Sequence, residues 1–163
     1  MLTEQEFLAF LDVNGFVYQR LEHPAVFTCA EAELHRPSVP AVSTKNLFLC
    51  DKKARHFFLI VTACEKTVQL DRLSAELGVA HLRFGSEENL MHRLGVTRGS
   101  VTMLGLINDP DCQVEVWIDA EIWHAEYFLS HPLVNTATLV LAKSELERFF
   151  ALTGHAVHFF EEA

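Results

Sequence analysis

The sequence has few cations and no long apolar run. Thirteen Lys and Arg residues stand against 22 Asp and Glu residues, for a formal net charge of −9. Affinity for phosphates comes mainly from Lys and Arg, so this balance argues against a broadly basic nucleic-acid-binding surface, though not against a small local basic site. No convincing helix-turn-helix is present, so we expect no DNA partner. With no run long enough to span a membrane and no signal peptide, we expect a cytoplasmic protein without membrane contact.

Several enzyme motifs are missing as well. There is no G-x-G-x-x-G and no G-x-x-x-x-G-K-[ST], which argues against dinucleotide and nucleoside-triphosphate enzymes. The histidines are scattered, and H-E-x-x-H is absent, so we expect neither a metal nor a cofactor. No G-x-S-x-G occurs. A nucleophilic role for Ser100 would need a base that the sequence does not identify.

The four cysteines form no C-x-x-C pair, which leaves a zinc ribbon or a thioredoxin-type site unsupported. They are Cys29, Cys50, Cys64 and Cys112. We predict that all four are reduced thiols that act as small apolar side chains.

What is present indicates one folded domain over residues 1–163. Half of the residues are hydrophobic, and 13 are Phe. A chain of this length can bury a sizeable core, and neither an internal repeat nor a Pro/Gly/Ser linker divides it.

Capping boxes and apolar patterns predict a mixture of helices and strands. Helices are expected after the capping boxes Thr3-x-x-Glu6, Thr28-x-x-Glu31 and Ser144-x-x-Glu147, and over residues 71–77 and 87–94. Strands are expected over residues 16–22, 45–50, 56–63, 80–84, 114–119, 127–129, 136–141 and 156–160. Hairpins outnumber regular βαβ units. We therefore predict an α+β (mixed α/β) fold: a mixed, largely antiparallel and partly closed sheet with helices packed outside it.

The first polar segment that stands out is Thr44-Lys45-Asn46, at the head of a predicted buried strand. Lysine is among the least buried residue types. Lys45 is either a strand-end lysine whose ammonium reaches water or a cationic anchor for a phosphate or carboxylate, with Asn46 adding amide donors. From spacing alone the first interpretation is favoured.

Two further segments could carry chemistry. Residues 95–109 are rich in glycine around Ser100 and Thr102, and form either a surface loop or a turn whose backbone N–H groups converge on an oxyanion. Residues 131–141 begin with His131-Pro132 and include Asn135. They are either turn and strand residues or a site in which His131 positions substrate or relays a proton.

Together these segments resemble the YbaK/ProX family, the free-standing relatives of the editing domain inserted in bacterial prolyl-tRNA synthetase. The resemblance runs in order over nearly the whole chain, through "LEHPAVFTCAEAE", "STKNLFLCDKKARHFFLIV", "LRFGSEENLMHRLGVTRGSVTMLGLIND" and "HPLVNTATLVLAKSELERFF". It is greatest to the branch called PrdX or ProXp-ala. These elements are specific in combination and not singly.

The resemblance implies roles for individual positions. Lys45 matches the family lysine needed for deacylation, and His131 matches a pocket-side histidine, so these two are the expected catalytic residues. The expected substrate-binding residues are Asn46, Gly99, Ser100, Val101, Thr102 and Asn135. Many relatives have proline after the G-S-V-T stretch, whereas this chain has Met103, so the loop end is expected to be less rigid or differently placed.

The activity implied is trans-editing: hydrolysis of mischarged Ala-tRNA(Pro), with proline excluded by size. An aminoacyl ester is already activated, so its hydrolysis needs a positioned water and oxyanion stabilisation rather than a catalytic triad. The implied partner is the tRNA acceptor end, with prolyl-tRNA synthetase or elongation factor holding the rest. Open alternatives are Cys-tRNA(Pro) or Ser-tRNA as the substrate, and a non-catalytic synthetase-associated module.

Overall fold

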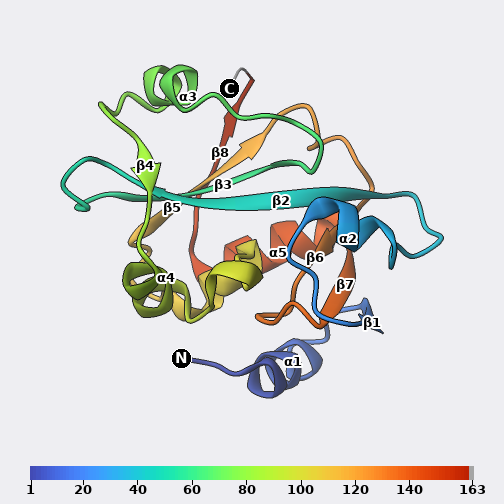
Figure 1. The fold of residues 1–163 in the computed structure, drawn as a ribbon. Helices are drawn as coiled ribbons and strands as arrows, with labels where there is room; N and C mark the ends of the chain where they lie inside the picture. The colour runs from blue at the N-terminus through green and yellow to red at the C-terminus, as the bar shows by residue number, and fades with distance from the viewer. Residues whose placement is uncertain (162–163) are drawn as a thin grey trace.

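One long strand, β2 (Ala41–Cys50), crosses the centre of the molecule and pairs with three other strands (Figure 1). The structure is a computed structural model and describes residues 1–161. The other strands are β1 (Tyr18–Glu22), β3 (Phe57–Ala63), β4 (Arg83–Phe84), β5 (Val114–Asp119), β6 (Tyr127–Ser130), β7 (Ala137–Ala142) and β8 (Val157–Phe160). The helices are α1 (Glu4–Val13), α2 (Cys29–Glu33), α3 (Leu70–Leu77), α4 (Glu87–Leu94) and α5 (Lys143–Thr153), with 3-10 helices η1 (Arg98–Ser100) and η2 (Met103–Asn108).

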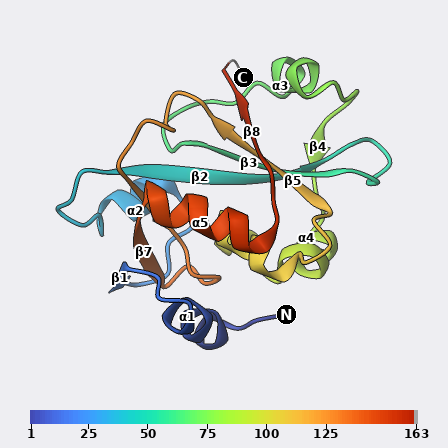
Figure 2. The same ribbon diagram turned by 180° about the vertical axis from the view of Figure 1, so that it is seen from behind.

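The strands form one mixed sheet in the order β1-β7-β6-β2-β3-β5-β8, with β4 added on β2. Four pairings are antiparallel, and three are parallel. Helix α2 lies in front of β2 in Figure 1, and α5 lies in front of it in the reverse view of Figure 2. The prediction of a mixed sheet with helices packed outside it is confirmed.

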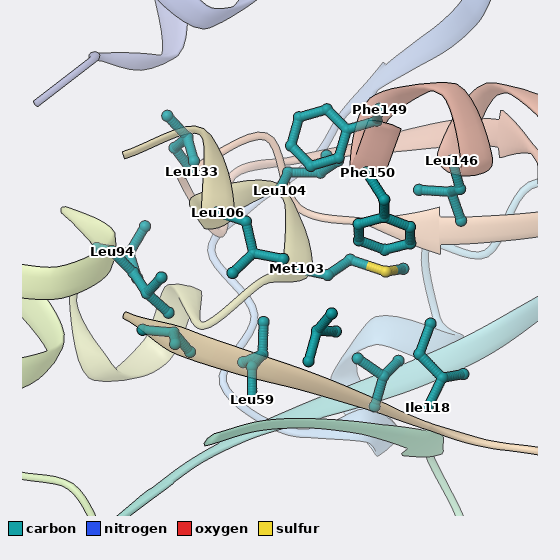
Figure 3. Close-up of a cluster of buried hydrophobic side chains, with 14 of the residues drawn as sticks. Leu59, Leu94, Met103, Leu104, Leu106, Ile118, Leu133, Leu146, Phe149 and Phe150 are labelled. Atoms are coloured by element: carbon teal, nitrogen blue, oxygen red, sulfur yellow. The ribbon is translucent and has the colours of Figure 1, made fainter. Parts of the chain in front are cut away.

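Buried side chains on both faces explain the continuous apolar run of β3. Phe57, Leu59 and Val61 join the large core cluster, which also holds side chains of α1, α4, η2 and α5 (Figure 3). Phe58 and Ile60 point the other way, into a smaller cluster with α3. Successive residues of a strand face opposite sides, so a strand covered on both faces is apolar throughout.

Local capping signals hold for most helices, but one was wrong. Thr3 and Glu6 form the reciprocal capping box of α1, and Thr28 accepts from the Glu31 N–H at the start of α2. The predicted box at Ser144 does not form, because α5 begins two residues earlier than that box requires, at Lys143, with Ala142 as N-cap and no side-chain cap. Strand β7 ends at Ala142 and is therefore followed by α5 without a connecting loop.

The start of β2 also differs from the prediction. The strand begins at Ala41 rather than Lys45, because residues 41–43 pair in parallel with β6. Lys45 therefore lies in the middle of a strand and not at its head. Parallel pairing with a segment more than 80 residues away leaves no local sequence signal.

One edge of β2 is paired at its two ends and open between them. On the side away from β3, β6 pairs with residues 41–43, and β4 pairs with Leu49 and Cys50. Among residues 1–161, no strand pairs with residues 44–48 on this side. The polar residues Lys45 and Asn46 lie in this gap of the sheet.

Candidate active site

A cavity of about 160 Å³ lies beside the gap in the sheet. Its walls come from residues 26–32, the middle of β2, Cys64 after β3, η1 with Val101, and His131 after β6. It brings together Lys45, Asn46, Gly99, Val101 and His131 from three separate segments, all predicted as site residues from the sequence.

Lys45 and Asn46 supply a cation and an unused acceptor to this cavity. Lys45 is half-buried and forms no ion pair within residues 1–161. The Oδ1 atom of Asn46 is buried without a hydrogen-bond partner. A buried acceptor without a partner is costly, so Asn46 is well placed to receive a hydrogen bond from a bound molecule or water.

His131 is held in one orientation by the chain that follows it. Its Nδ1 lies 3.0 Å from the carbonyl oxygen of Ala137, which only accepts, so Nδ1 carries the proton. Burial lowers the pKa of His131 below its ordinary value; the Ala137 carbonyl opposes this, and the nearby His23 adds to it. Near neutral pH the ring is therefore uncharged, with Nε2 as the lone-pair nitrogen.

In the glycine-containing loop, some residues face the cavity and others the interior. Arg98, Gly99 and Val101 line the cavity, whereas Ser100 and Thr102 are buried. The Ser100 N–H already donates to the Thr97 carbonyl, and Thr102 Oγ1 accepts from Leu104 as the N-cap of η2. Of the four predicted loop residues, Gly99 and Val101 therefore face the cavity, and Ser100 and Thr102 support the loop from within the protein.

Asn135 contacts the cavity wall rather than lining the cavity. Its side-chain amide donates to the Val26 carbonyl at 3.0 Å, and its own carbonyl accepts from the Val26 N–H. A Cβ atom on Gly99 would lie 3.3 Å from the same amide and 3.0 Å from the ring of Phe27. Asn135 thus holds the segment before α2 against the glycine loop, and Gly99 leaves room for both.

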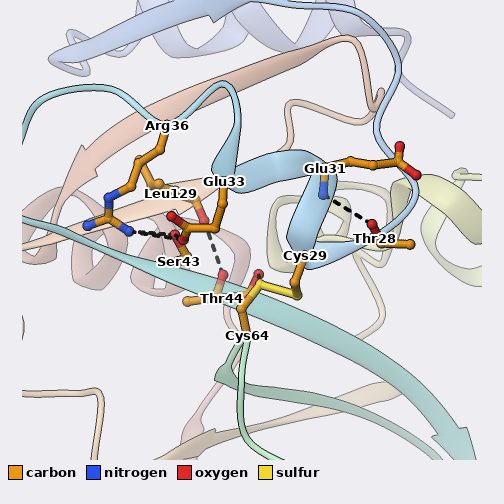
Figure 4. Close-up of a disulfide and its surroundings, with 9 residues drawn as sticks. All are labelled: Thr28, Cys29, Glu31, Glu33, Arg36, Ser43, Thr44, Cys64 and Leu129. Atoms are coloured by element: carbon orange, nitrogen blue, oxygen red, sulfur yellow. Dashed lines mark hydrogen bonds and ion pairs between the residues drawn. A yellow bond between two sulfur atoms is a disulfide. The ribbon is translucent and has the colours of Figure 1, made fainter.

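A disulfide borders the cavity, and it corrects the prediction of four free thiols. Cys29, the first residue of α2, is bonded to Cys64, the residue after β3 (Figure 4). Cys50 and Cys112 are free. The bond ties α2, which buries none of its own residues, to the end of the central hairpin.

A smaller recess of about 50 Å³ adjoins the cavity and shares Ala32, Thr44, Asn46, Cys64 and His131 with it. Ser130, only 4% exposed, also lines the recess, and its Oγ has no hydrogen-bond partner. The recess is small, with room for a short side chain, and its lining includes two unpaired polar atoms, Ser130 Oγ and Asn46 Oδ1.

Several wall residues were not predicted from the sequence. Phe27 and Arg98 line the cavity, and both are largely exposed, at 72% for Phe27 and 73% for the Arg98 side chain. Sequence reasoning passed over them because an isolated exposed Phe and an arginine beside a glycine carry no pattern. Cys29 and Cys64 were missed because their separation of 35 residues matches no cysteine motif.

Two other site types find no support in residues 1–161. No group of three or more His, Cys, Asp or Glu side chains there could hold a metal ion. No helix in that range is both long and apolar enough to cross a membrane.

Comparison with known proteins decides the family. A sequence profile described as "Aminoacyl-tRNA editing domain" matches residues 23–149, which include every wall of the cavity. This protein belongs to the aminoacyl-tRNA editing domain family. It is a member of the YbaK/ProX group, whose proteins act as aminoacyl-tRNA deacylases.

Individual relatives of this editing domain agree with that assignment. A prolyl-tRNA synthetase associated domain-containing protein 1 of Danio rerio is 37% identical over 93% of this chain and 81% of its own length. The prolyl-tRNA editing protein ProX of Acetoanaerobium sticklandii is 33% identical over 95% and 94%. A solved structure described as a candidate trans-editing enzyme for prolyl tRNA synthetase has the same fold, with a TM-score of 0.70 at 18% identity over 100% and 99% of the two chains.

Proposed function

We propose that this editing domain hydrolyses the ester of mischarged Ala-tRNA(Pro) to alanine and free tRNA(Pro), and spares Pro-tRNA(Pro). The observation that carries the proposal is the 50 Å³ recess beside Lys45 and His131 in a chain whose relative is named for prolyl-tRNA editing. Such a recess is far below the roughly 300–1,000 Å³ of a typical ligand pocket and suits a methyl group better than a pyrrolidine ring.

In this proposal the catalytic groups act on an ester that lies across the 160 Å³ cavity. Neutral His131 accepts a proton from water through Nε2 as the water attacks the carbonyl carbon. Lys45 and the backbone of Gly99 and Val101 stabilise the negative oxygen that forms. The bond to the ribose oxygen then breaks, and that oxygen takes up the proton.

The remaining predicted residues have supporting roles. Asn46 Oδ1 receives a hydrogen bond from the α-ammonium group or the attacking water. Asn135, Ser100 and Thr102 hold the walls in place. The partner is the acceptor end of tRNA, and prolyl-tRNA synthetase or elongation factor holds the remainder of the molecule.

Ser130 favours a second candidate substrate. Its Oγ and Asn46 Oδ1 are both buried, unpaired and on the recess lining. A seryl side chain carries a hydroxyl that could pair with them, whereas alanine leaves them to water. Ser-tRNA is therefore the alternative to compare first.

The test is deacylation of Ala-tRNA(Pro), Ser-tRNA and Pro-tRNA(Pro) by the purified protein and by Lys45→Ala. We expect the alanyl ester to be cleaved, the prolyl ester to be spared, and Lys45→Ala to lose about 10²–10³-fold in rate, as for loss of one oxyanion-stabilising group. Lys53→Ala is the matched control, because Lys53 is exposed on the β2–β3 turn, outside the cavity. Cleavage no faster than in buffer would refute the activity, and a non-catalytic synthetase-associated module would then be favoured.

A further inference from the structure

A second groove continues from the catalytic cavity along β2. It has a volume of about 410 Å³ and shares Asn46, Arg98 and Val101 with the cavity. It is also lined by Phe84, the last residue of β4, and by Gly85, which follows it. The groove therefore leads from the site of chemistry toward the strand that closes the gap in the sheet.

Phe84 is an exposed aromatic side chain on a fixed backbone. It is 59% exposed, although its main chain pairs with Leu49 of β2. The next N–H, from Gly85, donates to the Phe48 carbonyl at 2.9 Å. A Cβ atom on Gly85 would come within 2.4 Å of the Phe48 ring, so this position has no space for a side chain. The Phe84 ring is thus presented to solvent by a rigid support.

Arg98 places a positive charge between the cavity and the groove. The Arg98 and Glu87 side chains are both largely exposed, and Arg98 Nε lies 3.5 Å from Glu87 Oε1, which makes a weak pair. Phe27, which also lines the cavity, presents a second exposed ring over Gly99, the residue that follows Arg98. The cavity and the groove together therefore carry two exposed rings, Phe27 and Phe84, and two cations, Lys45 and Arg98.

We propose that this groove binds the unpaired 3′ end of tRNA, with the base next to the terminal adenosine stacked on Phe84 and its phosphate held by Arg98. The inference rests on the proposed function, because it assumes that the ester occupies the neighbouring cavity. Exposed aromatic rings interleaved with cations are how proteins hold single-stranded nucleic acid without reading its sequence. Although the chain has a net charge of −9, Arg98 and Lys45 place positive charge beside the groove, where it complements the negative charge of a phosphate strand.

The first test measures binding and does not depend on catalysis. An oligoribonucleotide that ends in cytidine-cytidine-adenosine and carries no amino acid is titrated into the protein, and aromatic NMR signals are followed. We expect saturable shifts of the Phe84 ring signals, weaker binding for Phe84→Ala and Arg98→Ala, and near-normal binding for Phe84→Tyr, which keeps a stacking ring. Phe159→Ala is the control, because Phe159 is an exposed Phe on β8. No shift at Phe84, or equal binding by Phe84→Ala, would overturn the proposal.

The second test compares full-length Ala-tRNA(Pro) with the alanyl ester of adenosine, which lacks the preceding nucleotide. Phe84→Ala should lower kcat/KM for the tRNA about 5- to 100-fold more than for the adenosine ester, the range expected for one stacked base. An equal loss on both substrates would overturn the groove assignment while leaving the editing activity intact. If the wild-type protein cleaves neither ester, the proposed function has failed, and the oligonucleotide titration alone decides whether the groove binds RNA.

Discussion

His131 Nδ1 donates its proton to the Ala137 carbonyl, so in the proposed mechanism Nε2 is the nitrogen that accepts a proton from water. Because burial lowers the pKa of His131 from its ordinary 6.5, the neutral ring persists to more acidic pH than in an exposed histidine. Protonation removes the Nε2 lone pair. The acidic limb of a pH–rate profile therefore belongs below pH 6.5.

We expect deacylation by the wild-type protein to be level from about pH 6.5 to 8 and to fall below that range. His131→Asn keeps a donor near the Ala137 carbonyl but lacks the basic nitrogen. It should lose about 10²–10⁴-fold in kcat and also lose the acidic limb. A variant of normal rate, or an unchanged limb in a slow variant, would show that another group titrates.

The same pKa shift predicts a stability change with a definite sign. The unfolded chain binds the His131 proton more tightly than the folded chain, so this residue's full contribution to stability is present above the unfolded pKa. The contribution is lost as the pH falls through about 6.5 toward the lowered folded value.

Met103 answers the question raised by the missing proline in the glycine loop. Its side chain is fully buried between the sheet and α5, at the first position of η2 (Figure 3). The loop end is therefore anchored by core packing instead of by a proline ring. We expect Met103→Ala to lower the free energy of unfolding by about 2–5 kcal/mol in chemical denaturation. The exposed Met91→Ala should change it by less than about 0.5 kcal/mol, and equal effects would contradict the anchoring role.

At the scale of elements, the disulfide and the start of β2 are features that local sequence patterns did not predict. Most helices and strands were predicted close to their observed bounds, because capping residues and apolar periodicity act over a few residues. The early start of β2, the parallel pairings and the Cys29–Cys64 bond all depend on segments that meet only after folding. Lys45 and His131 were predicted as site residues through a resemblance to a family. Phe27, Arg98 and Phe84 were not predicted, because they come together only in the folded chain.

Because the Cys29–Cys64 disulfide cross-links the chain, we expect the stability of the protein to depend on reductant. A bond between cysteines 35 residues apart restricts the unfolded chain, so chain-entropy arguments give about 3–4 kcal/mol of stabilisation. Reductant should lower the denaturation midpoint of the wild-type protein and leave that of the Cys29→Ser, Cys64→Ser double variant unchanged. Cys112→Ser should keep the wild-type sensitivity, because Cys112 is free. A wild-type midpoint indifferent to reductant would show that the bond does not form in solution.

At the scale of the whole molecule, net charge limits how tRNA is held. With an excess of acidic residues and few cations near the site, the proposal gives uncharged tRNA at most two phosphate contacts, one at Arg98 and, because no ester then occupies Lys45, a second at Lys45. The slope of log K against log salt should then be about −1 to −2 for uncharged tRNA(Pro), measured by fluorescence anisotropy. A slope steeper than about −4 with tight binding would mean that the protein holds the body of the tRNA itself. In that case prolyl-tRNA synthetase or elongation factor would not be needed to hold it.

The position of β2 has a consequence for how the site opens. This strand joins the β1-β7-β6 part of the sheet to the β3-β5-β8 part, and Lys45 and Asn46 lie between its two sets of partners. The Lys45 amide proton, which points toward β3, should exchange with solvent only when the molecule unfolds globally, whereas the Asn46 amide points into the gap of the sheet. Amides of α2, which buries no side chain of its own, should exchange through local opening. The strand at the base of the site thus unfolds only together with the core. Any local opening that admits a substrate is expected in the wall formed by residues 26–33.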